Sequence, residues 1–213
     1  MAKLKYYIKA TATIKLLSGL HIGGSKEGIK IGGIDNPVIR HPLTNHPYIP
    51  GSSLKGRFRM ALEIKYDDVN VDRDGTGPST DIDNPSQIAR MFGTGPAAEA
   101  TRFIFRDSTL SDGFGKYVKG VEKIELKMDR AKMAGYHRGN RTQEIIAADA
   151  QFDFEVMMRI FEGDDEELFK TRLEEAVFIV EQEYLGGSGT RGYGKVKFSK
   201  LNYTTIEIWN EKD

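Results

Sequence analysis

The sequence of 213 residues contains no cysteine and a single tryptophan. Without cysteine, neither a disulfide framework nor a thiolate zinc site can form. No apolar run approaches the roughly 20 residues that a membrane-spanning helix needs. The first residues also lack the apolar segment of a secretory signal peptide. These absences predict a cytoplasmic protein that has no membrane partner.

The charges are distributed unevenly along the chain, although the formal net charge is zero. Residues 1–60 hold 10 Lys and Arg against 2 Asp and Glu, whereas residues 151–185 hold 3 against 11. Residues 61–113 are also acidic, and residues 114–150 are basic. This pattern fits either ordinary surface scatter or a molecule with one cationic face that suits a polyanion.

The hydrophobic pattern predicts one α+β domain over residues 1–213. Residues 6–17 alternate apolar and polar side chains, which predicts a half-buried strand with a basic outer face. We expect helices at 52–66, capped by Ser52 or Ser53, and at 164–184, capped by Asp164 or Asp165. Further strands are expected at 101–110, 119–129, 150–161 and 192–209. The order strand, helix, strands, helix, strand predicts a ferredoxin-like (RRM-like) sandwich.

Two stretches interrupt this pattern. Residues 67–90 are acidic and short of large apolar side chains, so we expect an insertion there. The carboxylates from Asp67 to Asp83 belong either to a solvated loop or to a cation site, but no Glu stands at the closing position of a calcium loop. Residues 129–150 separate two expected strands, which predicts a long hairpin arm.

The stretch "IPGSSLKGRFR" at 49–59 places small residues ahead of three cations. Small residues leave backbone N–H groups accessible, and the N-terminus of a helix favours an anion. Ser52, Ser53, Lys55 and Arg57 are therefore candidate contacts to the phosphates of a passing chain.

A second glycine-rich stretch, "GSGTRG" at 187–192, matches the dinucleotide-binding fingerprint letter for letter. That fingerprint follows a strand and opens a helix, whereas this stretch follows an expected helix and precedes a strand, so we reject a nucleotide site. A glycine helix cap explains one or two of the five glycines between 186 and 194. The others indicate close approach to an extended ligand, with Gly187, Gly189 and Arg191 as candidate contacts to it.

Several motifs together resemble the RAMP superfamily of CRISPR proteins, and more closely the backbone subunit of type III-A (Csm) effector complexes. The resemblance spans nearly the whole chain. The motifs occur in the order "LSGLHIGG" (17–24), "GGIDNPVIR" (32–40), "YIPGSSLKGRFR" (48–59), "RMFG" (90–93), "FRDS" (105–108) and "GGSGTRGYGKVKF" (186–198).

The resemblance implies a subunit that stacks head to tail along a CRISPR RNA, beside other subunits of a type III complex. It implies that the hairpin arm, or thumb, kinks this RNA and that an aspartate matching Asp35 cuts complementary target RNA at the kink. His21, Ser52, Ser53, Lys55 and Arg57 match guide-contacting positions, and Arg130 matches a position at the base of the thumb. The stretch "GNRTQEIIAADA" departs from the family pattern within the thumb.

The sequence around Asp35 leaves two interpretations open. Asp-Asn-Pro is typical of a turn, whereas a carboxylate beside RNA can take a proton or hold a divalent metal ion such as Mg²⁺ or Mn²⁺. Asp107 and Glu125 are candidate helpers, unless they only make hydrogen bonds at strand ends. His41 and His46 lack a third ligand, which favours loop surface over a metal site.

Three other functions remain alternatives. The chain could be an RNA-binding backbone subunit that does not cut RNA, or an endoribonuclease that processes precursor CRISPR RNA. The latter family usually has a duplicated sandwich and a histidine-centred site, which this sequence lacks. A generic RRM-like protein would expose aromatic side chains on its sheet, where the first strand offers Lys and Thr instead.

Overall fold

The first strand confirms the alternation read from the sequence. In the computed structural model, which describes residues 2–24, 34–69, 86–93 and 100–209, β1 covers Leu4–Leu16. Ile8, Ala10 and Ile14 are almost fully buried, whereas Lys9 between them is half-buried and Lys15 beyond them is exposed. β1 is therefore the strand on which the core is assembled.

The main sheet is antiparallel and has β1 near its centre. Its order is β3–β7–β1–β8, and β9 also pairs with β1. The bounds of its other strands are β3 (Phe103–Phe105), β7 (Gln151–Phe161), β8 (Val196–Phe198) and β9 (Asn202–Glu207). Ile8 lies opposite Met158 and Ile14 opposite Phe152 in the register of β1 and β7. Four of the five strands expected from the sequence thus reach this sheet, and the stretch 119–129 does not.

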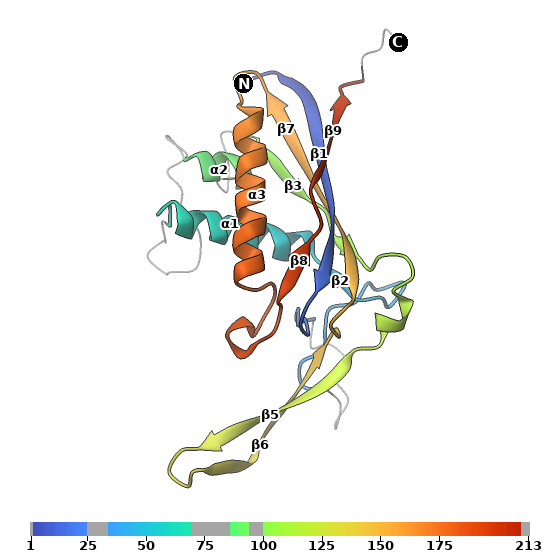
Figure 1. Cartoon of the computed structure of the whole chain (residues 1–213), viewed down its shortest axis with the longest axis vertical. Helices are drawn as coiled ribbons and strands as arrows, with labels where there is room; N and C mark the ends of the chain where they lie inside the picture. The colour runs from blue at the N-terminus through green and yellow to red at the C-terminus, as the bar shows by residue number, and fades with distance from the viewer. Residues whose placement is uncertain (1, 25–33, 70–85, 94–99, 210–213) are drawn as a thin grey trace.

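Two long helices, α1 (Gly51–Lys65) and α3 (Glu166–Gln182), pack on the same face of this sheet (Figure 1). Phe58 of α1 stacks on Phe154 of β7, with ring centroids 5.6 Å apart, and meets Phe198 of β8 edge-on. Both helices bury apolar stripes here, so the structure is a mixed α/β fold with antiparallel sheets. Among the described residues, no helix has the length and apolar character to cross a membrane.

The helix starts differ in part from the prediction. Asp165 caps α3 and accepts a 3.0 Å hydrogen bond from the N–H of Leu168. Asp164 instead pairs with Arg102, with 3.0 Å between Oδ2 and Nε. The expected cap at Ser52 or Ser53 is wrong, because Pro50 occupies the cap position of α1 and no side chain bonds there as an N-cap. The Pro50 carbonyl accepts from Ser53 N–H and places both serines inside the first turn.

The hairpin arm is formed by β5 (Val121–Asp129) and β6 (Ala134–Ile145) and projects away from the sheet (Figure 1). The expected bounds of the arm, 129–150, are therefore wrong. β5 forms the first strand of the arm, and β6 returns as its second strand. Arg130 lies in the turn between the two strands. The expected position of Arg130 at the base of the thumb is wrong, since the turn is the end farthest from the sheet.

Short elements complete the chain. β2 (Tyr48–Ile49) pairs with β4 (Ser108–Thr109), and η1 (Gly115–Val118) precedes the hairpin. The expected insertion at 67–90 ends in a helix, α2 (Gln87–Phe92), whose Ile88, Met91 and Phe92 are buried. Residues 70–85, and with them most of the carboxylates considered as a cation site, lie outside the described residues.

Candidate nucleic-acid interface

Asp35 is exposed and lies against the hairpin. Its Oδ2 accepts a 2.8 Å hydrogen bond from the backbone N–H of Thr142 in β6. The neighbouring Asn36 exchanges backbone hydrogen bonds with β6, from its N–H to the Thr142 carbonyl and from Glu144 N–H to its own carbonyl. The segment with Asp35 therefore pairs with the free edge of β6, near the base of the arm.

Glu144 holds this segment in place, a role that no motif in the sequence indicates. Its side chain is buried, with the residue 7% exposed. Oε2 accepts from Val38 N–H at 2.8 Å, and Oε1 pairs with Arg40 at 2.5 Å. Since a buried carboxylate needs such partners, Glu144 ties the segment after Asp35 to the hairpin. Only a tertiary contact between residues 106 positions apart reveals this role.

His21 joins the hairpin base to the glycine-rich loop, defined here as residues 186–194. Its Nδ1 lies 2.8 Å from the backbone oxygen of Glu144, so Nδ1 carries the proton because a carbonyl can only accept. Its own carbonyl accepts a 2.8 Å hydrogen bond from Gly187 N–H. The structure thus brings His21, Asp35 and the loop toward the same hairpin base.

The glycines of this loop approach the protein's own backbone and rings. Gly186 has φ +76°, and a Cβ there would lie 2.5 Å from the His21 carbonyl oxygen. A Cβ on Gly189 would overlap the Tyr184 ring. A cap at Gly186 or Gly187 is wrong, because α3 ends with Glu183 in the cap position. These two close approaches are intramolecular, so the glycine content alone does not require a ligand.

Arg191 and Glu125 connect the loop to the hairpin. Arg191 Nε lies 3.3 Å from Glu125 Oε1, and the Arg191 side chain is 52% exposed. Tyr193 donates its hydroxyl to the same carboxylate oxygen at 3.0 Å. Glu125 is therefore engaged by the loop, and its side-chain contacts with described residues do not include Asp35. This arrangement favours the structural interpretation of Glu125 over a helper role in catalysis.

The carboxylate of Asp107 binds the N-terminus of α1, where a phosphate was expected. Asp107 Oδ1 accepts a 2.7 Å hydrogen bond from Gly51 N–H. A carboxylate at this position also favours the positive end of the helix dipole. This geometry favours the strand-end role of Asp107 and does not place it with Asp35. Ser52 remains exposed beside it, and Ser53 is half-buried.

Lys55 and Arg57 follow on α1 and differ in their surroundings. Lys55 is half-buried and has no carboxylate partner among the described residues; its pKa is lowered by burial and by the nearby Arg59 charge. Arg57 is only 9% exposed, donates from Nε to the Tyr184 carbonyl at 2.8 Å and pairs with Glu183. Its burial argues against a direct phosphate contact, whereas Lys55 suits one.

The described residues contain no group of three or more His, Asp or Glu side chains that could hold a metal ion. Asp35 offers one carboxylate, whose Oδ1 has no hydrogen-bond partner among the described residues, so this donor set fits only an ion whose other ligands come from RNA and water. His41 Nδ1 lies 3.3 Å from the N–H groups of Leu43 and Thr44, which agrees with a loop role.

The chain was compared with known proteins. The model of the RAMP superfamily matches residues 13–197. The chain belongs to this superfamily. All the site residues predicted above, from His21 to Arg191, lie within the RAMP match, and their individual roles stay predictions.

Two relatives are similar along most of their length. The chain is 40% identical to the CRISPR system Cms endoribonuclease Csm3 of Methanocaldococcus jannaschii, over 93% of this chain and 81% of that protein. The protein of the same name from Streptococcus thermophilus is also 40% identical, over 93% of this chain and 90% of its own. The resemblance stated from the sequence is thereby confirmed.

Two solved structures of type III CRISPR complexes contain chains with a similar fold. A chain in the crystal structure of the Csm3–Csm4 subcomplex in the type III-A CRISPR–Cas interference complex superposes with a TM-score of 0.61 at 28% identity, covering 96% of this chain and 82% of that one. A chain in the Type III-B Cmr-beta complex bound to cognate target RNA gives a TM-score of 0.65 at 19% identity, covering 95% and 61%, and shows the fold alone.

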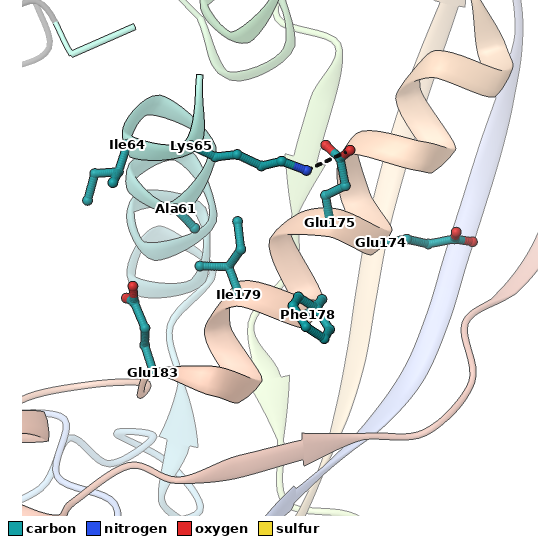
Figure 2. Close-up of a pocket in the computed structure, with 8 residues that line it drawn as sticks. All are labelled: Ala61, Ile64, Lys65, Glu174, Glu175, Phe178, Ile179 and Glu183. Carbon is teal, nitrogen blue, oxygen red and sulfur yellow. Dashed lines mark ion pairs between the residues drawn. The ribbon is translucent and has the colours of Figure 1, made fainter. Parts of the chain in front are cut away.

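An apolar groove lies elsewhere on this RAMP domain, between α1 and α3. It encloses about 530 Å³, and Ile64, Phe178 and Ile179 supply apolar walls (Figure 2). Lys65 and Glu175 form an ion pair of 2.8 Å across it. The groove contains none of the residues predicted to bind RNA, but one end reaches Glu183, the partner of Arg57.

Proposed function

We propose that this RAMP protein is the guide-RNA-binding backbone subunit of a type III CRISPR effector complex and that it cuts complementary target RNA. Two relatives that are 40% identical over nearly the whole chain carry the name of an endoribonuclease of such a system. The strand order β3–β7–β1–β8, with α1 and α3 on one face, further supports the finer assignment as a ferredoxin-like sandwich.

The observation that carries the proposal is the contact of Asp35 with Thr142. It places an exposed carboxylate on the hairpin, beside the segment that joins His21 to the glycine-rich loop. A guide RNA would pass over Ser52, Ser53 and Lys55 at the start of α1 and over Gly187, Gly189 and Arg191 of the loop. The target strand would then reach Asp35 at the hairpin base, and Arg130 would contact RNA or a neighbour at the tip.

Asp35 can act through its own carboxylate. Thr142 N–H fixes Oδ2, which leaves Oδ1 to accept a proton from a 2′-hydroxyl or a water. Mg²⁺ or Mn²⁺, when bound by Asp35 together with RNA phosphate and water, would supply positive charge for the crowded phosphate. Such an ion would bind weakly, because one protein carboxylate cannot form a tight site.

The partners follow from the same proposal. They are CRISPR RNA, single-stranded target RNA, further copies of the chain stacked head to tail, and other subunits of the complex. A head-to-tail contact repeats without closing and suits an elongated guide. We expect the assembly to work in the cytoplasm.

The experiment is to purify the complex from cells that carry the CRISPR array, sequence its bound RNA and supply a labelled complementary RNA. We expect guides of uniform repeat-derived sequence and cuts at regular intervals that stop with a chelator and resume with Mg²⁺ or Mn²⁺. An RNA-loaded complex that leaves the target intact would establish the structural alternative. Release of guides from a precursor by the chain alone would establish the processing alternative.

A further inference from the structure

The buried cation Arg57 carries an inference beyond the site described so far. We propose that Arg57 is a positioning residue: it holds the glycine-rich loop against α1, so that Arg191 faces the RNA, and it does not bind phosphate itself. This inference rests on the proposed RNA-binding function, and it assigns to Arg57 a role different from the one its sequence position suggested.

The first step is where the guanidinium directs its donors. Nε donates to the Tyr184 carbonyl at 2.8 Å, Nη2 pairs with Glu183, and Nη1 lies 3.9 Å from the Met60 sulfur. The Arg57 side chain is 8% exposed, whereas that of its partner Glu183 is 44% exposed. A buried guanidinium is stable only with such partners. If Arg57 turned toward a phosphate, it would lose its hydrogen bond to the Tyr184 carbonyl and its ion pair with Glu183.

The second step is the stack that continues from Arg57 into the loop. The guanidinium lies over the Tyr184 ring, 4.8 Å from its centroid. Gly189 also lies against this ring, since a Cβ at Gly189 would overlap it. Arg57, Tyr184 and Gly189 therefore form one packed column that runs from α1 to the loop.

The third step is what the column orients. Leu185, which follows Tyr184, is fully buried and donates its N–H to the Gly194 carbonyl at 2.8 Å, which closes the loop. Arg191 is an exposed residue of this closed loop, and its side chain contacts Ser188 and Glu125. Its position thus depends on how the loop is seated on Tyr184.

Salt dependence of RNA binding separates positioning from contact. We would titrate the full chain with a labelled single-stranded RNA of mixed sequence at several salt concentrations. On a plot of the logarithm of the binding constant against the logarithm of the salt concentration, one lost phosphate contact makes the slope less steep by roughly 0.7. Arg191→Ala and Arg57→Ala should each flatten it by that amount, and the double variant should flatten it no further. A double variant that flattens the slope by roughly 1.4 would show two independent contacts and overturn the proposal, as would unchanged binding by Arg57→Ala.

Gly189→Ala offers a variant without any change of charge. Its Cβ forces the Tyr184 ring out of the column, so we expect the affinity and slope of Arg57→Ala, with no further loss when the two are combined. Gly115→Ala is the matched control, because a Cβ there meets nothing within 4 Å. Wild-type binding by Gly189→Ala would contradict the column.

Hydrogen exchange without RNA tests the seating of the loop by itself. The N–H groups of Gly187 and Gly194 donate to the carbonyls of His21 and Gly19, both at 2.8 Å. In Arg57→Ala and Gly189→Ala, but not in Gly115→Ala, both amides should exchange faster while β1 and β7 stay protected. Unchanged exchange overturns the positioning role. Faster exchange in a protein that binds no RNA would confirm the seating and refute the proposed function instead.

Discussion

The carboxylate of Asp35 accepts a hydrogen bond from the backbone N–H of Thr142, 107 residues later in the chain. The acceptor lies in a turn-forming segment and the donor in the projecting hairpin, so the candidate nuclease site is built from two separate parts of the sequence. The backbone donor is kept when the side chain of Asp35 is changed. This property allows the charge of Asp35 to be tested apart from its position.

Asp35→Asn should abolish most target cleavage and leave assembly intact. The amide oxygen of Asn can still accept from Thr142 N–H, so the segment keeps its place, but it can neither take a proton nor hold a metal ion well. We expect the cleavage rate of the assembled complex to fall by about 10²- to 10⁴-fold, with guide content unchanged. Asp35→Ala should match it in rate. Near wild-type cutting by the Asn variant would assign Asp35 to the turn alone.

Asp107→Ala should lower stability without stopping cleavage. The change removes the acceptor for Gly51 N–H at the start of α1. Loss of a helix-capping side chain typically costs about 0.5–2 kcal/mol, which a denaturant titration can resolve. Asp107→Asn should restore part of this stability, since its oxygen can still accept. A collapse of cleavage in a stably assembled Asp107→Asn complex would return Asp107 to the list of catalytic helpers.

Glu144→Ala should destabilise the domain because Val38 N–H loses its side-chain acceptor and Arg40 loses this carboxylate partner. Val38 N–H and the Arg40 guanidinium both bond to this buried carboxylate. Hydrogen bonds to a charged group are worth about 1.5–3 kcal/mol each, so thermal melting should show a clear loss. Glu122→Ala provides a matched control, as Glu122 is an exposed carboxylate of the same hairpin. Equal melting temperatures for the two variants would refute the anchoring role of Glu144.

Lys55→Ala should weaken RNA binding through charge alone. Lys55 is half-buried, has no carboxylate partner among the residues the structure describes, and lies in the first turns of α1. Its removal should flatten the salt dependence of single-stranded RNA binding by roughly 0.7 in log–log slope, with little change in melting. Lys5→Ala, near the start of β1 and far from the hairpin in Figure 1, should leave the slope unchanged. Equal slopes for Lys55→Ala and the wild type would remove Lys55 from the interface.

The elements that build the core could be predicted from the sequence, because their signal is local. Burial alternates along β1, and the acidic first turn of α3 begins at the predicted cap Asp165. The roles of Arg57 and Glu144 could not be predicted, because the groups that bind these buried charges lie more than 100 residues away in the sequence. Arg130 was misplaced because β6 is polar and carries no apolar period that marks a returning strand.

The pairing of residues 35–36 with β6 has a mechanical consequence. The hairpin is joined to the body at one end, while its turn at Arg130 stands free of the main sheet (Figure 1). A force applied at the tip therefore exerts leverage on the base of the hairpin. The Asp35 carboxylate would move together with β6, because it is hydrogen-bonded to Thr142 of that strand. In an assembly where neighbouring molecules press on each tip, the stiffness of this two-stranded ribbon would determine how much of that force reaches Asp35.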